Sequence, residues 1–179
     1  MTVEIIEGRE AWVKLGALEL LLGAIVGIHR AVEVILAGRQ NRARGLDDDG
    51  NVWTRQIEGA IAEEAVAHAV DRFWGGAGAI DRGRITAPKP TGGDVGRLQV
   101  RLRIASPYDQ NKRLIVQQRD DPSEDFVLVV GRAPTYRVVG WINAGEAKRH
   151  PEWIANPGNY GEAWFVPQAS LRDLKEIAA

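Results

Sequence analysis

Apolar residues recur at intervals of three and four over two long segments, and this spacing is typical of helices that bury one face. The first segment covers residues 9–38, and the second covers residues 52–74 and stops at Gly75-Gly76. Residues 39–50 between them carry three arginines and then three consecutive aspartates before a glycine. We interpret that run as a solvated surface loop rather than a nucleic-acid-binding arm. The pattern therefore predicts an N-terminal helical segment with a charged loop over residues 1–50, followed by a second helix.

A different periodicity begins after the Gly- and Pro-rich stretch that ends at Gly93. Residues 98–104 alternate with period two, which predicts a strand with Leu98 and Val100 on one face and Gln99 and Arg101 on the other. Short β-type runs follow at residues 114–117, 126–130, 136–142 and 163–166. Short helices are expected at residues 146–153 and 170–177, the latter capped by Ser170. This order of elements predicts an α/β (α+β) fold in which a sheet, partly a meander, is flanked by helices.

Composition narrows the class of protein. The chain has 179 residues, of which 45% are hydrophobic and 26% charged, so one globular domain over residues 1–179 is expected. The formal net charge of -1 provides no overall field for nucleic acid or membrane. The absence of cysteine excludes disulfides, thiolate zinc sites and cysteine nucleophiles. The longest apolar stretch, residues 17–28, is interrupted by Glu19 and is too short for a membrane span, and no secretory signal is seen, so we expect a cytoplasmic protein.

The candidate catalytic residues are an acidic residue on the second predicted helix and a set of polar residues at and before the first predicted strand. Glu63 is in the helix, Asp94 follows a Gly-Gly turn, and Gln99 and Arg101 share one strand face. Hydrolysis of a phosphodiester needs neutralisation of the transition-state charge and hydroxide near neutral pH, and a divalent cation held by carboxylates provides both. The positive charge of Arg101 can hold the phosphate. Each residue alone fits a structural role equally well: an exposed helix stripe, a turn residue or a solvated strand face. Their joint order favours the functional interpretation.

These residues resemble the PD-(D/E)XK, or restriction-endonuclease-like, nuclease superfamily, whose pattern is a helix glutamate, an aspartate and then Glu-x-Lys on a neighbouring strand. Several short segments of the sequence also resemble a group of uncharacterised phage and bacterial proteins. These segments are Ile57-Glu58-Gly59-Ala60-Ile61-Ala62-Glu63, Asp94-Val95-Gly96, Leu114-Ile115-Val116 and Val138-Val139-Gly140-Trp141-Ile142. This similarity spans residues 53–166. The resemblance implies a mixed, mostly four-stranded central sheet flanked by helices, with residues 51–179 forming the nuclease-like core.

The resemblance also implies a site and a function. Glu63, Asp94, Gln99 and the Val100 carbonyl would bind Mg²⁺ or Mn²⁺, and Arg101 would hold the scissile phosphate of nucleic acid, DNA rather than RNA. Gln99 stands where the superfamily has a carboxylate, and Arg101 where it has lysine, so activity would be weak or lost. Asp94 and Gln99 are five residues apart, so the Val95-Gly96 step must bend the chain to bring both to one site.

Local charge supports a nucleic-acid partner independently of the motif. Between residues 97 and 119 only Asp109 is acidic, whereas six residues are basic: Arg97, Arg101, Arg103, Lys112, Arg113 and Arg119. Such a strip can follow a phosphate backbone, and we assign Arg97, Arg103, Lys112 and Arg113 to nucleic-acid binding. The preferred hypothesis is a metal-dependent phage or prophage nuclease. The alternatives are an inactive nucleic-acid-binding module and a protein-interaction domain that uses the Trp-rich C-terminal third.

Overall fold

The computed structural model describes residues 2–6, 9–38, 51–76, 94–156 and 161–178. Two long helices, two sheets and several short helices make up this part of the chain, which confirms the mixed α and β class. The helices are α1 (Ala17–Leu36), α2 (Val52–Ala69), α3 (Ala144–Ala147) and α4 (Lys175–Ala178), with 3₁₀ turns at Pro151–Trp153 and Gln168–Ser170. The strands are β1 (Thr2–Ile6), β2 (Glu10–Lys14), β3 (Leu98–Ile104), β4 (Leu114–Gln117), β5 (Asp125–Arg132), β6 (Thr135–Asn143), β7 (Ile154–Ala155) and β8 (Ala163–Val166).

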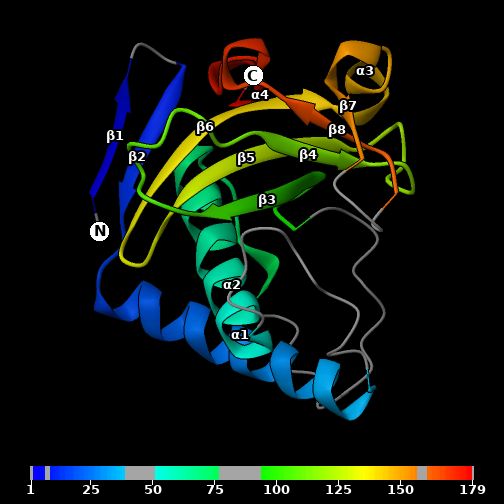
Figure 1. Cartoon of the computed structure of the whole chain (residues 1–179). Helices are drawn as coiled ribbons and strands as arrows, with labels where there is room; N and C mark the ends of the chain where they lie inside the picture. Colours follow the sequence, from blue (N-terminus) through cyan, green and yellow to red (C-terminus); the bar gives the residue numbers. More distant parts are fainter. Residues whose placement is uncertain (1, 7–8, 39–50, 77–93, 157–160, 179) are drawn as a thin grey trace.

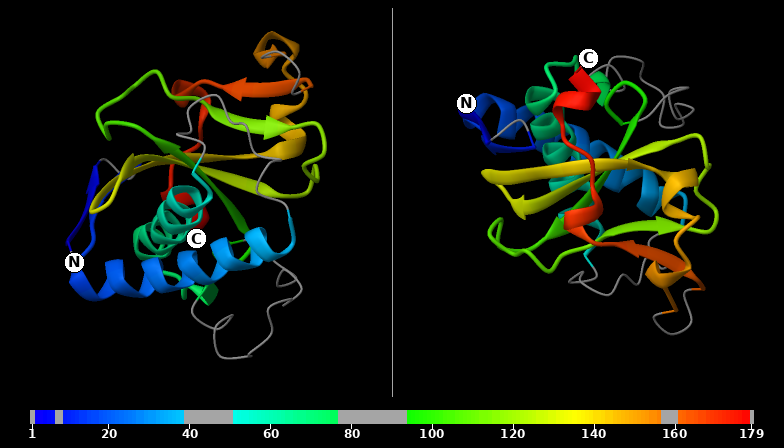
Figure 2. Two further views of the ribbon diagram at one scale, coloured as in Figure 1. Left: turned by 60° about the horizontal axis from the view of Figure 1, so that its bottom comes forward. Right: turned by 90° about the horizontal axis from the view of Figure 1, so that it is seen from above.

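The larger sheet is mixed and has the strand order β1-β2-β6-β5-β3. Its β3 runs parallel to β5, and the other neighbouring pairs are antiparallel. The smaller antiparallel sheet has the order β4-β8-β7. Figure 1 shows α2 lying between the larger sheet and α1, and Figure 2 shows α1 running across the outside of α2. The two long helices and the smaller sheet therefore lie on opposite sides of the larger sheet.

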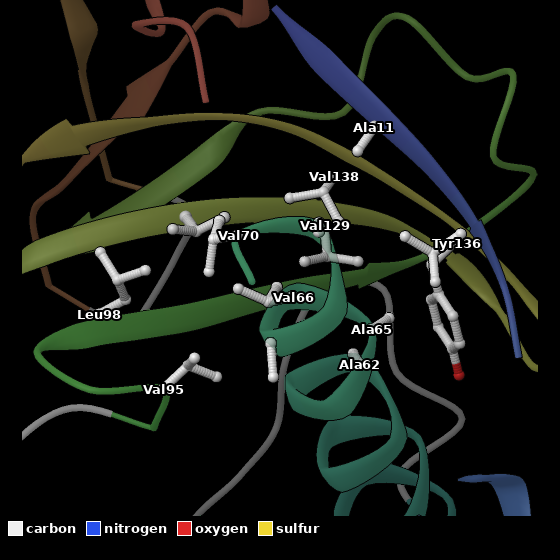
Figure 3. Packing of buried hydrophobic residues seen from close by; sticks show 14 of the residues in the cluster. Ala11, Ala62, Ala65, Val66, Val70, Val95, Leu98, Val129, Tyr136 and Val138 are labelled. Atoms are coloured by element: carbon white, nitrogen blue, oxygen red, sulfur yellow. The ribbon is translucent and has the colours of Figure 1, made fainter. Parts of the chain in front are cut away.

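Two apolar clusters follow from the alternation of the strands. Val127 and Val129 of β5 point toward α2, whereas Phe126 and Leu128 point toward β4 and β8. Small residues on α2, such as Ala62 and Ala65, bring that helix close to the sheet, as Figure 3 shows. The sheet is thus buried on both faces, and any side chain on β3 is assigned to one face by its parity.

Helix α1 approaches α2 through small residues. Gly23, Gly27 and Ala31 are buried and recur every four residues, so they lie on one face of the helix. A Cβ on Gly27 would lie 2.3 Å from the Cα of Ile57, and one on Gly23 would lie 2.7 Å from Cγ1 of Ile61. The two backbones are therefore in close contact, and neither glycine can carry a side chain without separating the helices.

The N-terminal helical segment expected over residues 1–50 is wrong at its start. Residues 10–14 form β2, whose Ala11 pairs with Val138 of β6, and α1 begins only at Ala17. Sheet pairing overrides the helix-like spacing because Ala11 and Val13 alternate toward the buried face of the sheet. The expected charged loop at residues 39–50 lies outside the described residues.

The C-terminal third also differs from expectation. The helix expected at residues 170–177 is wrong over its first half, because Leu171 is extended and Arg172 exchanges backbone hydrogen bonds with Trp141. Residues 146–153 form two short pieces, α3 and the 3₁₀ turn that begins at Pro151, instead of one helix. The predicted strands at residues 114–117, 126–130, 136–142 and 163–166 are confirmed.

The apolar pattern of this third predicts buried Val138, Ile142 and Phe165 and a close approach at Gly140 beneath Trp141, and the structure confirms this except at one residue. Val138 and Ile142 are buried, whereas Phe165 is half-buried. The expected close packing at Gly140 is present, since a Cβ there would lie 2.6 Å from the carbonyl oxygen of Arg172. Its φ of 157° also favours glycine.

Candidate functional site

Glu63 lies on the buried side of α2, where α1 crosses it. The Arg30 guanidinium, from α1, donates from Nη1 and Nη2 to the two carboxylate oxygens of Glu63 at 2.5 and 2.8 Å. The indole Nε1 of Trp74 donates a third hydrogen bond to Oε2 at 3.2 Å. Glu63 is 6% exposed, so a bidentate arginine pair and a tryptophan enclose this carboxylate.

Asp94 reaches the same neighbourhood through a tight turn. Val95 and Leu98 exchange backbone hydrogen bonds of 3.1 and 3.0 Å around Gly96, whose φ is +60°. The turn folds the chain back, so that Asp94 Oδ2 accepts the Val100 amide hydrogen bond at 2.8 Å. The expected bend at the Val95-Gly96 step is therefore confirmed. We call Arg30, Glu63, Trp74 and Asp94 the Glu63 cluster.

The Glu63 cluster contains one positively charged residue, Arg30, and two acidic residues, Glu63 and Asp94. Burial raises the pKa of Glu63 above its usual range, and the negative charge of Asp94 adds to this effect. The hydrogen bonds and charge of Arg30, together with the Trp74 indole, oppose the rise. Asp94 is therefore close enough to act electrostatically on Glu63, and the positive charge beside Glu63 is that of Arg30.

Gln99 and Arg101 do not join this cluster, and the expectation that they face the same cleft is wrong. Gln99 is 3% exposed and donates from Nε2 to Glu124 at 2.7 Å. Arg101 pairs with Asp120 at 3.1 Å and lies 4.3 Å above the ring of Phe126. These contacts lie on the face of the larger sheet that the smaller sheet covers.

The physical reason is the alternation of β3. Leu98, Val100 and Leu102 pack with the cluster beneath α2, so the side chains between them must point to the opposite face. The parallel register pairs Gln99 with Phe126 and Arg101 with Leu128, both of which belong to the other cluster. Val100 contributes its amide to Asp94 and packs its side chain on the α2 side.

A divalent cation does not fit the predicted ligand set. Both oxygens of Glu63 are occupied by Arg30, one oxygen of Asp94 accepts a backbone hydrogen bond, and Gln99 lies on the other face. Mg²⁺ and Mn²⁺ need several oxygen ligands around one point. Within the described part of the chain, no three histidine, aspartate or glutamate side chains are grouped to provide one.

The basic strip is partly neutralised by acids that fold onto it. Arg97 is exposed and pairs with Asp125 at 3.2 Å. Arg103 and Lys112 are half-buried and have partners, and Arg101 is held by Asp120 as described. Arg113 and Arg119, which flank β4, are exposed. The accessible positive charge therefore lies mainly around β4.

Sequence reasoning missed Arg30, Trp74 and Glu64. Arg30 is separated from Glu63 by 33 residues, so no local motif joins them. Glu64 is 5% exposed, and its Oε2 has no hydrogen-bond partner among the residues that the structure describes. Burial raises the pKa of Glu64 to about 7, and the negative charge of Glu19 adds to the rise. The only available signal was the adjacent pair Glu63-Glu64 in an Ala-rich helix, which cannot point both acids to solvent when α2 is covered on two sides.

Comparison with protein-family models, curated proteins and solved structures finds no match to this chain. The superfamily resemblance therefore stays a prediction. Nor does any helix among the described ranges have both the length and the hydropathy of a membrane span.

Proposed function

We propose that this chain is a nuclease-like module that binds nucleic acid, DNA rather than RNA, without hydrolysing it. The observation that carries the proposal is the bidentate Arg30–Glu63 pair, with N···O distances of 2.5 and 2.8 Å. In a metal-dependent nuclease a carboxylate at this point must be available to a cation. Here a guanidinium, which stays protonated at all relevant pH values, takes that place.

Three features support a nucleic-acid partner. The exposed Arg113 and Arg119 flank β4, and Arg97 projects from the turn before β3. The larger sheet is mixed, as the superfamily resemblance implies, although it has five strands where mostly four were expected. Such a module would contact phosphates through arginines and would need no cation.

The test is binding and cleavage of labelled single-stranded and double-stranded DNA. Binding should weaken as salt rises, with a logarithmic slope of roughly 0.9 per phosphate contact on duplex DNA. Arg113→Glu and Arg119→Glu should each weaken binding about tenfold and make the slope shallower. Lys175→Glu is the matched control, because Lys175 is 65% exposed on α4 and outside the basic strip.

Cleavage is measured in Mg²⁺, in Mn²⁺ and in chelator. The proposal requires intact DNA in all three. Cation-dependent cleavage that Glu63→Gln abolishes would support the metal-dependent nuclease instead, and an absence of binding at low salt would contradict any nucleic-acid role.

A further inference from the structure

Helix α1 presents its large apolar side chains outward. Its most exposed positions are all apolar. Seven of them are large and 38–67% exposed: Leu18, Leu21, Leu22, Ile25, Ile28, Val32 and Leu36. The charged residues of α1, such as Glu33 and Arg30, are only half-exposed. An outward helix face normally carries polar residues, so this arrangement is the reverse of the usual one.

The reversal follows from how α1 packs on α2. Because Gly23, Gly27 and Ala31 form the inner face, the inner side needs only small residues and leaves the large ones on the outer side. We call the seven exposed residues the α1 stripe. Among the residues that the structure describes, α2 is the element packed against α1, and Figures 1 and 2 show it on the side of α1 that faces the larger sheet.

The two long segments outside the described ranges have few large apolar residues in their sequence. Residues 39–50 and 77–93, the two long segments outside the described ranges, contain Leu46, Ile80 and Ile85 as their only large aliphatic residues. A lipid surface also fits poorly, since membrane-binding helices carry lysines and arginines, and Arg30 is the only one on α1 and is bound to Glu63.

We propose that the α1 stripe is the interface of a homodimer, in which α1 packs antiparallel against α1 of a second copy. Five residues of the stripe and the half-buried Ile35 follow a heptad pattern. Leu18, Ile25 and Val32 are seven residues apart, and Leu21, Ile28 and Ile35 lie three residues after them. A two-fold axis at the middle of α1 sets Leu18 opposite Ile35, Leu21 opposite Val32 and Ile25 opposite Ile28. Every layer is then apolar, and the helices overlap along their whole length.

The available area suits a dimer. If a fully exposed leucine or isoleucine contributes on the order of 180 Å², the stripe presents roughly 600 Å² per copy. Two copies would bury about 1,200 Å², which reaches the lower limit of specific interfaces. An isologous contact also closes on itself, so the assembly stops at two.

Antiparallel packing is favoured by two features. It places the N-terminal end of each helix dipole beside the C-terminal end of the other. It also separates the two β1–β2 hairpins, each of which immediately precedes the N-terminus of α1 and would meet the other in a parallel pair.

Sedimentation and light scattering test the dimer directly. The wild-type chain should have twice its monomer mass of 19.6 kDa. Ile25→Lys and Ile28→Lys, each at a partly exposed position that should still fold, should raise the dimer dissociation constant about 100-fold or more. Phe73→Lys, at a residue 86% exposed outside α1, should leave the dimer intact. A monomeric wild type, or a dimer that survives both lysine variants with native circular dichroism, would overturn the proposal.

Cysteine cross-linking tests the orientation, because the chain has no cysteine of its own. Leu21→Cys combined with Val32→Cys should form intermolecular disulfides under mild oxidation. Leu21→Cys alone should not form an intermolecular disulfide. In the antiparallel pair, residue 21 of one copy lies opposite residue 32 of the other, so the two copies of residue 21 are eleven residues, or roughly 16 Å, apart along the helix axis. Efficient cross-linking of the single variant would refute the antiparallel arrangement.

Discussion

Glu64 makes a testable contribution to the pH dependence of stability. The side chain lies between α1 and α2 and is 5% exposed, and one of its carboxylate oxygens finds no hydrogen-bond partner in the described part of the chain. A Cβ on Gly23 of α1 would lie 3.2 Å from that oxygen, so the carboxyl group faces the α1 backbone at close range. Replacing Glu64 with glutamine removes the charge and changes the shape little.

The magnitude follows from the pKa of Glu64, which burial raises from 4.5 to about 7, with repulsion from Glu19 adding to the rise. Between these two values the folded chain binds more protons than the unfolded chain. The free energy of unfolding therefore falls as pH increases through this window. The contribution is fully present below about pH 4.5 and is lost above about pH 7, and it amounts to about 1–3 kcal/mol.

Thermal unfolding at a series of pH values measures the effect. The difference in Tm between Glu64→Gln and wild type should grow in favour of the variant from pH 5 to pH 8, by roughly 3–10 °C for a chain of this length. Any cost of an unpaired amide is independent of pH and cancels in this comparison. Glu162→Gln, at an exposed residue, is the matched control and should keep the wild-type profile. A constant difference between Glu64→Gln and wild type across this range would refute the reasoning.

Three further predictions concern denaturant unfolding. Gln99→Glu should destabilise the fold by about 1–3 kcal/mol, because it places a carboxylate beside Glu124, which now accepts a 2.7 Å hydrogen bond from Gln99. Equal or greater stability would contradict this. Arg137→Met should lower the free energy of unfolding by about 3–5 kcal/mol, because Arg137 is 1% exposed and its guanidinium makes five hydrogen bonds. A decrease below about 1 kcal/mol would contradict this prediction. Gly27→Ala should cost about 1–3 kcal/mol, because its Cβ would lie 2.3 Å from the Ile57 backbone; an unchanged unfolding midpoint would show that the helices are not in close contact.

The strands were predictable because their local pattern agrees with their final environment. The alternation of residues 98–104 and the β-branched runs that became β4, β5 and β6 keep the same meaning in the folded sheet. Residues 10–14 do not, because the alternating Ala11 and Val13 lie within a longer stretch of helix-like spacing. Only the pairing of β2 with β6, more than 120 residues away, decides between the two structures.

The candidate site was only half predictable. That Glu63 and Asp94 are neighbours follows from a helix and a turn that flank the same sheet face. Once Leu98 and Val100 are placed beneath the helix that carries Glu63, parity directs Gln99 away from it. The opposite orientation of Gln99 could therefore be inferred from the sequence alternation. The pairing of Arg30 with Glu63 could not, because it depends on the crossing of α1 and α2, which no local sequence pattern contains.

Helix α1 connects the two proposals while leaving them separable. Its inner face brings Arg30 to Glu63 and so removes the carboxylate that cation chemistry would need, and its outer face carries the α1 stripe. Both properties follow from the same close approach at Gly23 and Gly27. The residues that each proposal requires are nevertheless different, since DNA binding rests on the arginines around β4 and dimerisation rests on the stripe. A monomer that binds DNA would therefore remove only the dimer, and a dimer that binds no DNA would remove only the nucleic-acid role.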